Sequence, residues 1–335
     1  MIKELQTKSF FVHKLKEEKM LLSIFLIIIG FIFLIVSADI LVDGSSGIAK
    51  KFHIPEIIIG LTIVSIGTSM PELFVSITSA LEGHSDMAIG NIIGSNLSNL
   101  LLILGLSAII KPIIFQKETR YYEIPMCLFF TIILMIFCNS QNKISRIEAT
   151  ILLILFCTFL GYTIFMGKKE SKNNLIEIDV KENKKNSTIK NIILIILGVV
   201  GLKIGGDLTV NNTVNVANYF NISEKIISLT ILAVGTSLPE LVTSVMAAIK
   251  GNSDIAIGNI IGSNIFNILL IIGMSAVINP ITYNVTYNFD LSILLLSTVI
   301  LAIFPFIPPK EKMSRANGFV YFLMYVIYLV ILIVK

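Results

Sequence analysis

The sequence has no tryptophan, three histidines and three cysteines, and only 14% of its 335 residues are charged. So little charge excludes an ordinary soluble domain, in which about a quarter of residues are charged. Cys127, Cys138 and Cys157 show neither metal-binding nor redox spacing, and we interpret them as small core residues. The histidines lie outside the apolar segments, so we expect no imidazole chemistry within a membrane.

Long apolar runs are what the sequence does have. Hydrophobic residues make up 55% of the chain, and the mean hydropathy is +0.87. A helix needs about 20 consecutive apolar residues to cross about 30 Å of hydrocarbon. Ten runs meet this requirement: 20–42, 57–81, 87–110, 121–139, 146–166, 189–210, 226–249, 255–278, 288–308 and 315–334. We therefore predict an all-α membrane protein with ten transmembrane helices and no soluble catalytic domain.

The chain also contains an internal duplication. A shift of 168 residues aligns its halves without a gap, and 21 of 33 positions are identical between 67–99 and 235–267. "GTSMPELFVSITSALEGHSDMAIGNIIGSNLSN" stands over "GTSLPELVTSVMAAIKGNSDIAIGNIIGSNIFN". General hydrophobicity does not reproduce glycine, proline, serine, asparagine and glutamate at one offset, so the two segments are copies of one unit.

Equivalent spans of the two copies are five apart in the chain. Because five is odd, the second copy must enter the membrane from the opposite side. Such an inverted-topology repeat is typical of secondary transporters, which bind their substrate near the midplane between the halves. We predict four segments: an N-terminal basic tail at 1–19, a first five-helix repeat at 20–166, a loop at 167–188 and a second, inverted five-helix repeat at 189–335.

The distribution of basic residues predicts the orientation. Loops after odd-numbered spans carry 16 Lys or Arg, against nine on the other side. Since loops rich in Lys and Arg stay in the cytoplasm, we expect the loop 167–188 there and both termini outside the cell (inner) membrane. This role also accounts for the net charge of +4 without nucleic-acid binding.

The N-terminus leaves an alternative open. Five of the nine basic residues on the outer side lie in 1–19 and argue against this orientation. That tail and the apolar run after it also resemble a signal peptide with a cleavage site near Ser37 and Ala38. We favour a membrane span, because the run is long for a signal peptide and the repeat requires it.

Each copy of GTSxPE places a glutamate, Glu72 or Glu240, directly after a proline. Because proline has no N–H, the carbonyl four residues earlier loses its helical partner, and the distortion also loosens the neighbouring threonine carbonyl. Unpaired backbone oxygen at membrane depth is tolerated only where it lines a cavity or a binding site. A simple proline kink is the structural alternative, but a symmetric pair of midmembrane carboxylates indicates function.

Every group that these segments offer is an oxygen: two carboxylates, backbone carbonyls, and the hydroxyls of Thr68, Ser69, Thr236 and Ser237. Hard cations such as Ca²⁺ prefer six to eight oxygen ligands, and two glutamates balance the charge of one Ca²⁺. The same hydroxyls and carbonyls could hold Na⁺. Soft metals are not expected, because no thiol or imidazole stands nearby.

The second part of each copy, "GNIIGSNLSN" or "GNIIGSNIFN", combines small and polar residues. Its GxxxG glycines are interpreted as helix-packing positions: Gly90, Gly94, Gly258 and Gly262. Serine and asparagine four residues apart share a helix face that we expect to point at the glutamates: Ser95 with Asn99, and Ser263 with Asn267. The remaining asparagines are interpreted as interhelical hydrogen-bonding residues: Asn91, Asn96, Asn259 and Asn264.

Three further charged residues lie in the apolar runs. Lys203 and Asp207 are four apart in the sixth span, so a mutual ion pair is expected. Asp39 stands near the end of the first span, where its carboxylate is expected to reach the interface.

At these residues the sequence resembles a known family. The two GTSxPE segments, each followed by GNIIGSN…N, resemble the α-repeats of the Ca²⁺/cation antiporter superfamily, on its prokaryotic sodium/calcium exchanger branch. The resemblance covers nearly the whole chain. It implies alternating access around a core of spans 2, 3, 7 and 8, past which the long tilted spans 1 and 6 slide.

The resemblance also implies roles for individual residues. Ca²⁺ would be held by two carboxylates and two carbonyls, those of Glu72, Glu240, Thr68 and Thr236. Flanking Na⁺ sites would use the hydroxyls of Ser69, Ser95, Ser237 and Ser263, and the carbonyls of Ser65 and Ala233. Asn99 and Asn267 would line the centre. Some relatives carry Asp at the position of Asn267, so this sequence gives no reason to infer K⁺ transport.

The leading interpretation is a secondary active transporter that exchanges Na⁺ for Ca²⁺, with the lipid bilayer as its environment. It is not expected to be an enzyme, to hold a cofactor or to need a protein partner. A Ca²⁺/H⁺ antiporter could use the same glutamates, although such relatives tend to carry a different motif. A cation channel would build its glutamate ring by oligomer symmetry, and a hydrolase using Ser69 or Ser237 would lack a base.

Overall fold

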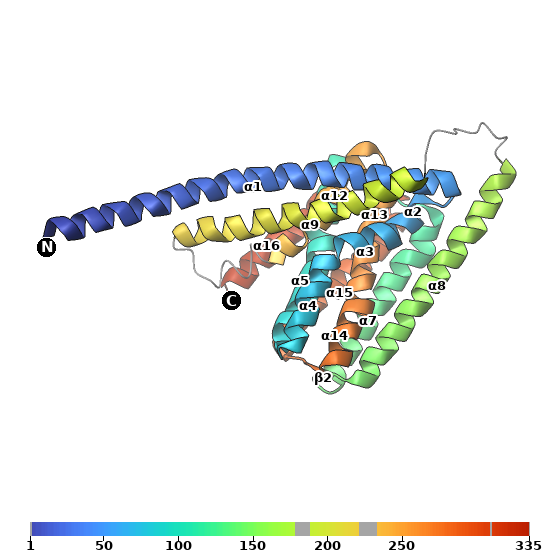
Figure 1. Cartoon of the computed structure of the whole chain (residues 1–335). Coiled ribbons are helices and arrows are strands. Elements are labelled where there is room, and N and C mark those ends of the chain that lie inside the picture. The colour runs from blue at the N-terminus through green and yellow to red at the C-terminus, as the bar shows by residue number, and fades with distance from the viewer. Residues whose placement is uncertain (1, 178–187, 221–232, 309, 335) are drawn as a thin grey trace.

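The computed structural model describes residues 2–177, 188–220, 233–308 and 310–334. Figure 1 shows two long helices, α1 (Ile2–Phe52) and α9 (Thr188–Tyr219), side by side and running across the remaining helices. By the offset of 168 residues, α9 is the counterpart of α1 in the second half. Helix α1 has no proline before Pro55 to interrupt it.

Each half continues with short helical pieces and then with longer helices. The first half contains α2 (Glu56–Ile59), the wide turn η1 (Gly60–Val64), α3 (Ser65–Thr68), α4 (Met70–Leu81), α5 (Ser85–Leu97), η2 (Ser98–Ile103), α6 (Leu104–Ile110), η3 (Thr119–Glu123), α7 (Ile124–Ser140) and α8 (Arg146–Glu177). After α9, the second half contains α11 (Ala233–Thr236), α12 (Leu238–Lys250), α13 (Ser253–Phe266), η5 (Asn267–Ile271), α14 (Ile272–Ile278), η6 (Val285–Tyr287), α15 (Asn288–Ile303), η7 (Phe304–Phe306) and α16 (Arg315–Val334).

The predicted helical membrane protein is confirmed. Eight described helices are long and apolar enough to span a membrane, and a ninth span results if Glu56–Thr68 and Met70–Leu81, bent by 50°, are counted together. The predicted run 226–249 lies partly outside the described residues, and its described part holds α11 and α12. The chain is therefore an integral multi-pass membrane protein.

Two spans form the centre of the molecule. The span Met87–Ile110 is 83% buried and the span Ser253–Ile278 is 94% buried, whereas the other candidate spans are 22–39% buried. The outer helices expose Leu, Ile, Val and Phe side chains, which suits a hydrocarbon environment. The central pair carries the second part of each sequence copy, so the polar residues of that part face protein.

Two short antiparallel ladders join the halves. Strand β1 (Ile113–Ile114) pairs with β4 (Lys312–Met313), and β2 (Lys143–Ile144) pairs with β3 (Ile281–Thr282). The offset of 168 converts β1 into β3, and each of these two strands pairs with a strand of the other half. Helix α6 likewise contacts α16, while its counterpart α14 contacts α8. The halves therefore contact each other reciprocally.

Two predicted boundaries differ from the structure. The basic tail 1–19 is part of α1, which continues unbroken from Ile2. The loop predicted at 167–188 begins later, because α8 continues through Glu177, and residues 178–187 lie outside the described residues. Ser37 and Ala38, at the alternative cleavage site, are buried within α1, which favours a span over a signal peptide.

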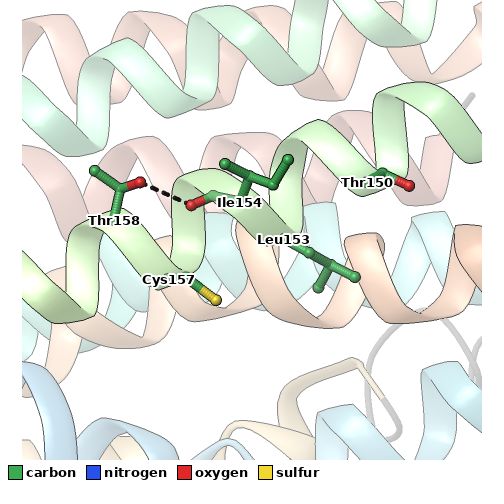
Figure 2. Close-up of a pocket in the computed structure, with 5 residues that line it drawn as sticks. All are labelled: Thr150, Leu153, Ile154, Cys157 and Thr158. Carbon is green, nitrogen blue, oxygen red and sulfur yellow. Dashed lines mark hydrogen bonds between the residues drawn. The ribbon is translucent and has the colours of Figure 1, made fainter.

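The prediction for one cysteine was wrong. Cys127 and Cys138 are buried, but Cys157 is exposed on α8. Figure 2 shows it in a surface hollow of about 430 Å³ whose five lining residues all come from α8. The Thr158 hydroxyl donates to the Ile154 carbonyl at 2.9 Å, and that of Thr150 donates to the Arg146 carbonyl at 2.7 Å. Both hydroxyls are bonded to their own helix, and no charged residue lines the hollow.

Candidate functional site

Both GTSxPE segments interrupt a helix at their serine. Ser69 separates α3 from α4 with φ −84° and ψ 10°, and Ser237 precedes α12 with φ −88° and ψ 7°. The proline stands in the first turn of the new helix, where its missing N–H needs no partner. Glu72 and Glu240 follow in that same turn, where the helix dipole favours a carboxylate.

Most of the predicted site residues are buried in the protein. Glu72 and Glu240 are each 1% exposed, as expected for groups that face protein rather than lipid. The other buried residues are Ser65, Thr68, Ser69, Ser95, Asn99, Ser237, Ser263 and Asn267. Thr236 is half-buried, and Ala233 is the first described residue of α11. The Ser65 carbonyl already accepts the Ser69 N–H at 3.0 Å.

Each glutamate is contacted by the motif serine of the other half. The Ser69 hydroxyl donates to Glu240 Oε1 at 2.7 Å and also lies 2.9 Å from Ser263 Oγ. The Ser237 hydroxyl donates to Glu72 Oε1 at 3.4 Å, and Ser95 Oγ lies 3.5 Å from the same oxygen. The contacts follow one pattern in both halves, but they are shorter around Glu240.

An asparagine behind each glutamate fixes the backbone there. Asn91 donates to Ser76 Oγ at 3.0 Å and to the Glu72 carbonyl at 3.4 Å. Its counterpart Asn259 donates in the same way, to Ser244 Oγ at 2.9 Å and to the carbonyl of Glu240 at 3.5 Å. The sequence analysis missed both of these serines, although they are among the identical positions of the two copies.

Four asparagines form a network across the centre. The side-chain amides of Asn96 and Asn264 each donate to the other residue's carbonyl at 3.4 Å. Asn99 donates to Asn264 Oδ1 at 3.0 Å, and Asn267 donates to Asn96 Oδ1 at 2.9 Å. The prediction of interhelical hydrogen bonds is confirmed, and the bonds hold the amide nitrogens of Asn99 and Asn267 away from the centre.

The hydrogen bonds leave a set of buried oxygens without a partner among the described residues: Glu72 Oε2, Glu240 Oε2, Asn99 Oδ1, Asn267 Oδ1 and Thr236 Oγ1. Buried acceptors without donors are unfavourable by themselves. A hard cation complements such a set, because carboxylate, amide and hydroxyl oxygens are its preferred ligands. Within the described part of the chain, no three His, Cys, Asp or Glu side chains cluster in a way that could hold a metal.

Wide helical turns were not predicted from the sequence. The turn η2 begins at Ser98 and η5 begins at Asn267, so both lie where the central helices carry their polar residues. Such turns occur frequently at functional sites because they change the direction of side chains within a helix. Nothing in the local sequence distinguishes them from ordinary α-helix.

The packing role of the glycines is confirmed for the second copy. A Cβ on Gly258 would lie 2.7 Å from the Ile57 carbonyl, and one on Gly262 would lie 2.8 Å from the Leu61 backbone. In the first copy, the corresponding segment 225–233 lies mostly outside the described residues, so the packing role of Gly94 stays a prediction.

A cavity of about 250 Å³ adjoins the site. One wall comes from α3 and α4 and includes Thr68 and Phe74, the opposite wall comes from α9, and Pro239 contributes from α12. The only charged residue that lines it is Lys203, whose Nζ lies 2.9 Å from Asp207 Oδ2, confirming that predicted ion pair. The cavity gives the buried oxygens around Thr68 a route toward the surface.

Comparisons with known proteins agree with this site. The model of the family described as sodium/calcium exchanger protein matches residues 22–165 and 190–334. The sodium/calcium exchanger MaX1 of Methanosarcina acetivorans is 30% identical over 92% of this chain and 97% of its own length. The inner membrane protein YrbG of Escherichia coli (strain K12) is 35% identical over 85% of this chain and 89% of its own.

A similar architecture is found among solved structures. A structure of the sodium-calcium exchanger NCX_Mj, soaked with Na⁺ and Sr²⁺, superposes with a TM-score of 0.80 at 32% identity. The superposition covers 92% of this chain and 98% of that one. The similarity therefore extends over both halves and includes the two interrupted helices.

Proposed function

The chain belongs to the sodium/calcium exchanger family, and on that premise we propose that it exchanges Na⁺ for Ca²⁺ across the membrane by alternating access. Ca²⁺ binds between Glu72 and Glu240, with the carbonyls of Thr68 and Thr236 as further ligands. One observation carries this assignment: two buried carboxylates, one from each half, keep one oxygen each without a partner.

The flanking groups suit Na⁺. Ser69 with Ser263, and Ser237 with Ser95, bring hydroxyls to the two glutamates, and the carbonyls of Ser65 and Ala233 complete the flanking sites. Asn99 and Asn267 line the centre with their free oxygens. Because the two ions compete for the same oxygens, one can leave when the other binds.

Exchange rather than leak follows from the electrostatics. Without a cation, the site holds two carboxylates that are both buried in the protein. Moving uncompensated charge through low dielectric is strongly unfavourable. The conformational change is therefore expected to be fast only when Ca²⁺ or Na⁺ neutralises the glutamates.

The proposed architecture is ten transmembrane helices in two inverted five-helix repeats. The reciprocal ladders and the reciprocal hydrogen bonds of the two motif copies support it. The protein is placed in the cell (inner) membrane with the segment around 167–188 in the cytoplasm and both termini outside, as the Lys and Arg distribution predicts.

Transport into proteoliposomes tests the proposed exchange. Vesicles that hold the purified protein and are loaded with Na⁺ should take up Ca²⁺, and uptake should vanish when Na⁺ is equal on both sides. A second set, free of Na⁺, replaces the sodium gradient by an outward proton gradient. Uptake in this second set would contradict Na⁺ coupling and identify a Ca²⁺/H⁺ antiporter that uses the same glutamates.

The asparagine network should set the affinity of the site. Asn264→Ala removes the acceptor of the Asn99 amide and the donor to the Asn96 carbonyl. Residues that orient metal ligands typically contribute about 10- to 100-fold in affinity, so the Ca²⁺ concentration for half-maximal uptake should rise by about that factor. Asn317→Ala is the control, because Asn317 bonds only to Ser314. An unchanged Ca²⁺ dependence in Asn264→Ala would contradict the role of the network.

A further inference from the structure

An ion-pair cluster ties the end of one core helix to α1. Lys250 is the last residue of α12, the helix whose first turn carries Glu240. Its Nζ lies 2.7 Å from Asp39 Oδ1 and 2.6 Å from Asp43 Oδ1, and it donates to the Asp39 carbonyl at 3.0 Å. Asp39 therefore does not extend alone to the interface, as the sequence analysis expected, but pairs with a lysine of the other half.

The cluster is partly shielded from solvent. The Lys250 side chain is 22% exposed. Burial alone lowers the pKa of Lys250, but hydrogen bonds to Asp39 and Asp43 and the charges of their carboxylates raise the pKa overall. The lysine therefore stays charged. Beside it, buried apolar residues of α1 and α12 pack in one cluster that includes Leu41, Ala247 and Ala248.

The corresponding interface of the other copy is open. A shift of 168 residues converts α1 into α9 and α12 into α4, but along their described residues α4 and α9 touch only marginally. The cavity that reaches Thr68 lies between these helices, with Phe74 on one wall and Lys203 on the other. One end of the transport core is thus packed against a long helix and the other end is not.

The charges at the open interface differ as well. The positions equivalent to Lys250, Asp39 and Asp43 are Glu82, Asp207 and Asn211. The Glu82 side chain is 62% exposed and lies 4.0 Å from His84, while Asp207 pairs with Lys203 of its own helix. Closing α9 onto α4 in the manner of α1 onto α12 would bring two carboxylates together.

We propose that Lys250, Asp39 and Asp43 form an ionic latch that holds α1 closed against α12 and keeps the cation site open toward the cavity between α4 and α9. The latch deepens the proposed alternating access and rests on it. When the two halves exchange roles, the ion pairs break and Glu82 approaches Asp207 and Asn211 instead. The latch therefore makes the two end states unequal in free energy and favours the one seen here.

Thiol labelling of the cavity measures this preference. A Phe74→Cys reporter in a Cys157→Ser background, reconstituted in proteoliposomes, reacts with a membrane-impermeant maleimide while the cavity is open. Lys250→Gln should lower the labelling rate about fivefold, the factor that corresponds to about 1 kcal/mol for one ion pair. Asp43→Asn, which removes one of the two carboxylates, should lower it by a smaller factor.

A matched control is available elsewhere in the fold. Arg120 lies 2.7 Å from Glu311, and the side-chain exposures of that pair, 14% and 61%, are close to those of Lys250 and Asp43, 22% and 61%. This pair involves neither α1 nor α9, so Arg120→Gln should leave the labelling rate unchanged. An equal rate in the Lys250→Gln and Arg120→Gln proteins would overturn the latch.

Exchanging the charges separates the latch from a general loss of folding. In Lys250→Asp with Asp43→Lys, the attraction is restored with its partners reversed, so the labelling rate should return toward that of the unaltered latch. A rate that stays as low as in Lys250→Gln would contradict the proposal. Labelling requires no transport, so a failure to exchange Na⁺ for Ca²⁺ in the uptake assay leaves this result interpretable.

Discussion

The Glu72→Gln/Glu240→Gln double variant should lose Ca²⁺ uptake by at least about 100-fold while remaining folded. Glutamine has nearly the same shape as glutamate and can keep a hydrogen bond to the facing serine, so packing around the site is preserved. It removes both negative charges that balance Ca²⁺. A divalent cation in a buried site without that compensation is strongly unfavourable.

The measurement is Na⁺-driven uptake of radioactive Ca²⁺ into proteoliposomes at matched protein content. Glu311→Gln is the control, because this glutamate is exposed and pairs with Arg120 far from the motif in the fold. Thermal unfolding of the purified double variant should resemble that of the unaltered protein. Robust Ca²⁺ exchange by the double variant would refute the site assignment, whereas loss of uptake together with unfolding would call for the single variants.

Gly262→Ala should destabilise the protein by about 1–3 kcal/mol and reduce transport, because this glycine sits at a backbone contact. A Cβ there would lie 2.8 Å from both Cα and the carbonyl oxygen of Leu61, and 2.7 Å from Ser65 Oγ. Backbone atoms cannot rotate aside as a flexible side chain can. The shift would also reach the site, because the next residue, Ser263, lies 2.9 Å from Ser69.

Gly161→Ala provides the comparison for this second variant. Gly161 lies on the exposed face of α8, and a Cβ there would meet no atom within 4 Å. Since alanine is the better helix former, this change should leave the melting temperature unchanged or slightly higher. Equal melting temperatures for both alanine variants would show that the contact between α13 and η1 tolerates a methyl group.

The chemical groups of the site could be predicted from the sequence because the information is local and duplicated. A glutamate after a proline within an apolar run is unusual at one position and significant at two. Serine and asparagine at a spacing of four residues identify a polar helix face. Ser76 and Ser244 could have been found in the same way, since they too are identical between the copies.

The partners of these groups could not be predicted. Ser69 bonds to Glu240 rather than to the glutamate of its own motif, and Lys250 pairs with Asp39 across the two halves. Contacts between residues this far apart in the chain depend on how whole helices pack. The wide turns at Ser98 and Asn267 likewise arise where the central helices meet, and no local pattern marks them.

The sequence by itself determined that the protein is an α-helical membrane protein with a duplicated motif of buried oxygens, because hydrophobic run length and residue chemistry are properties of the linear chain. Only the tertiary structure decided which copy of each interface is packed and which is open. Two nearly identical motif copies are compatible with either arrangement. The choice depends on differences outside the motif core, such as Lys250 in one half and Glu82 in the other, and on the packing of α1 and α9 against the core.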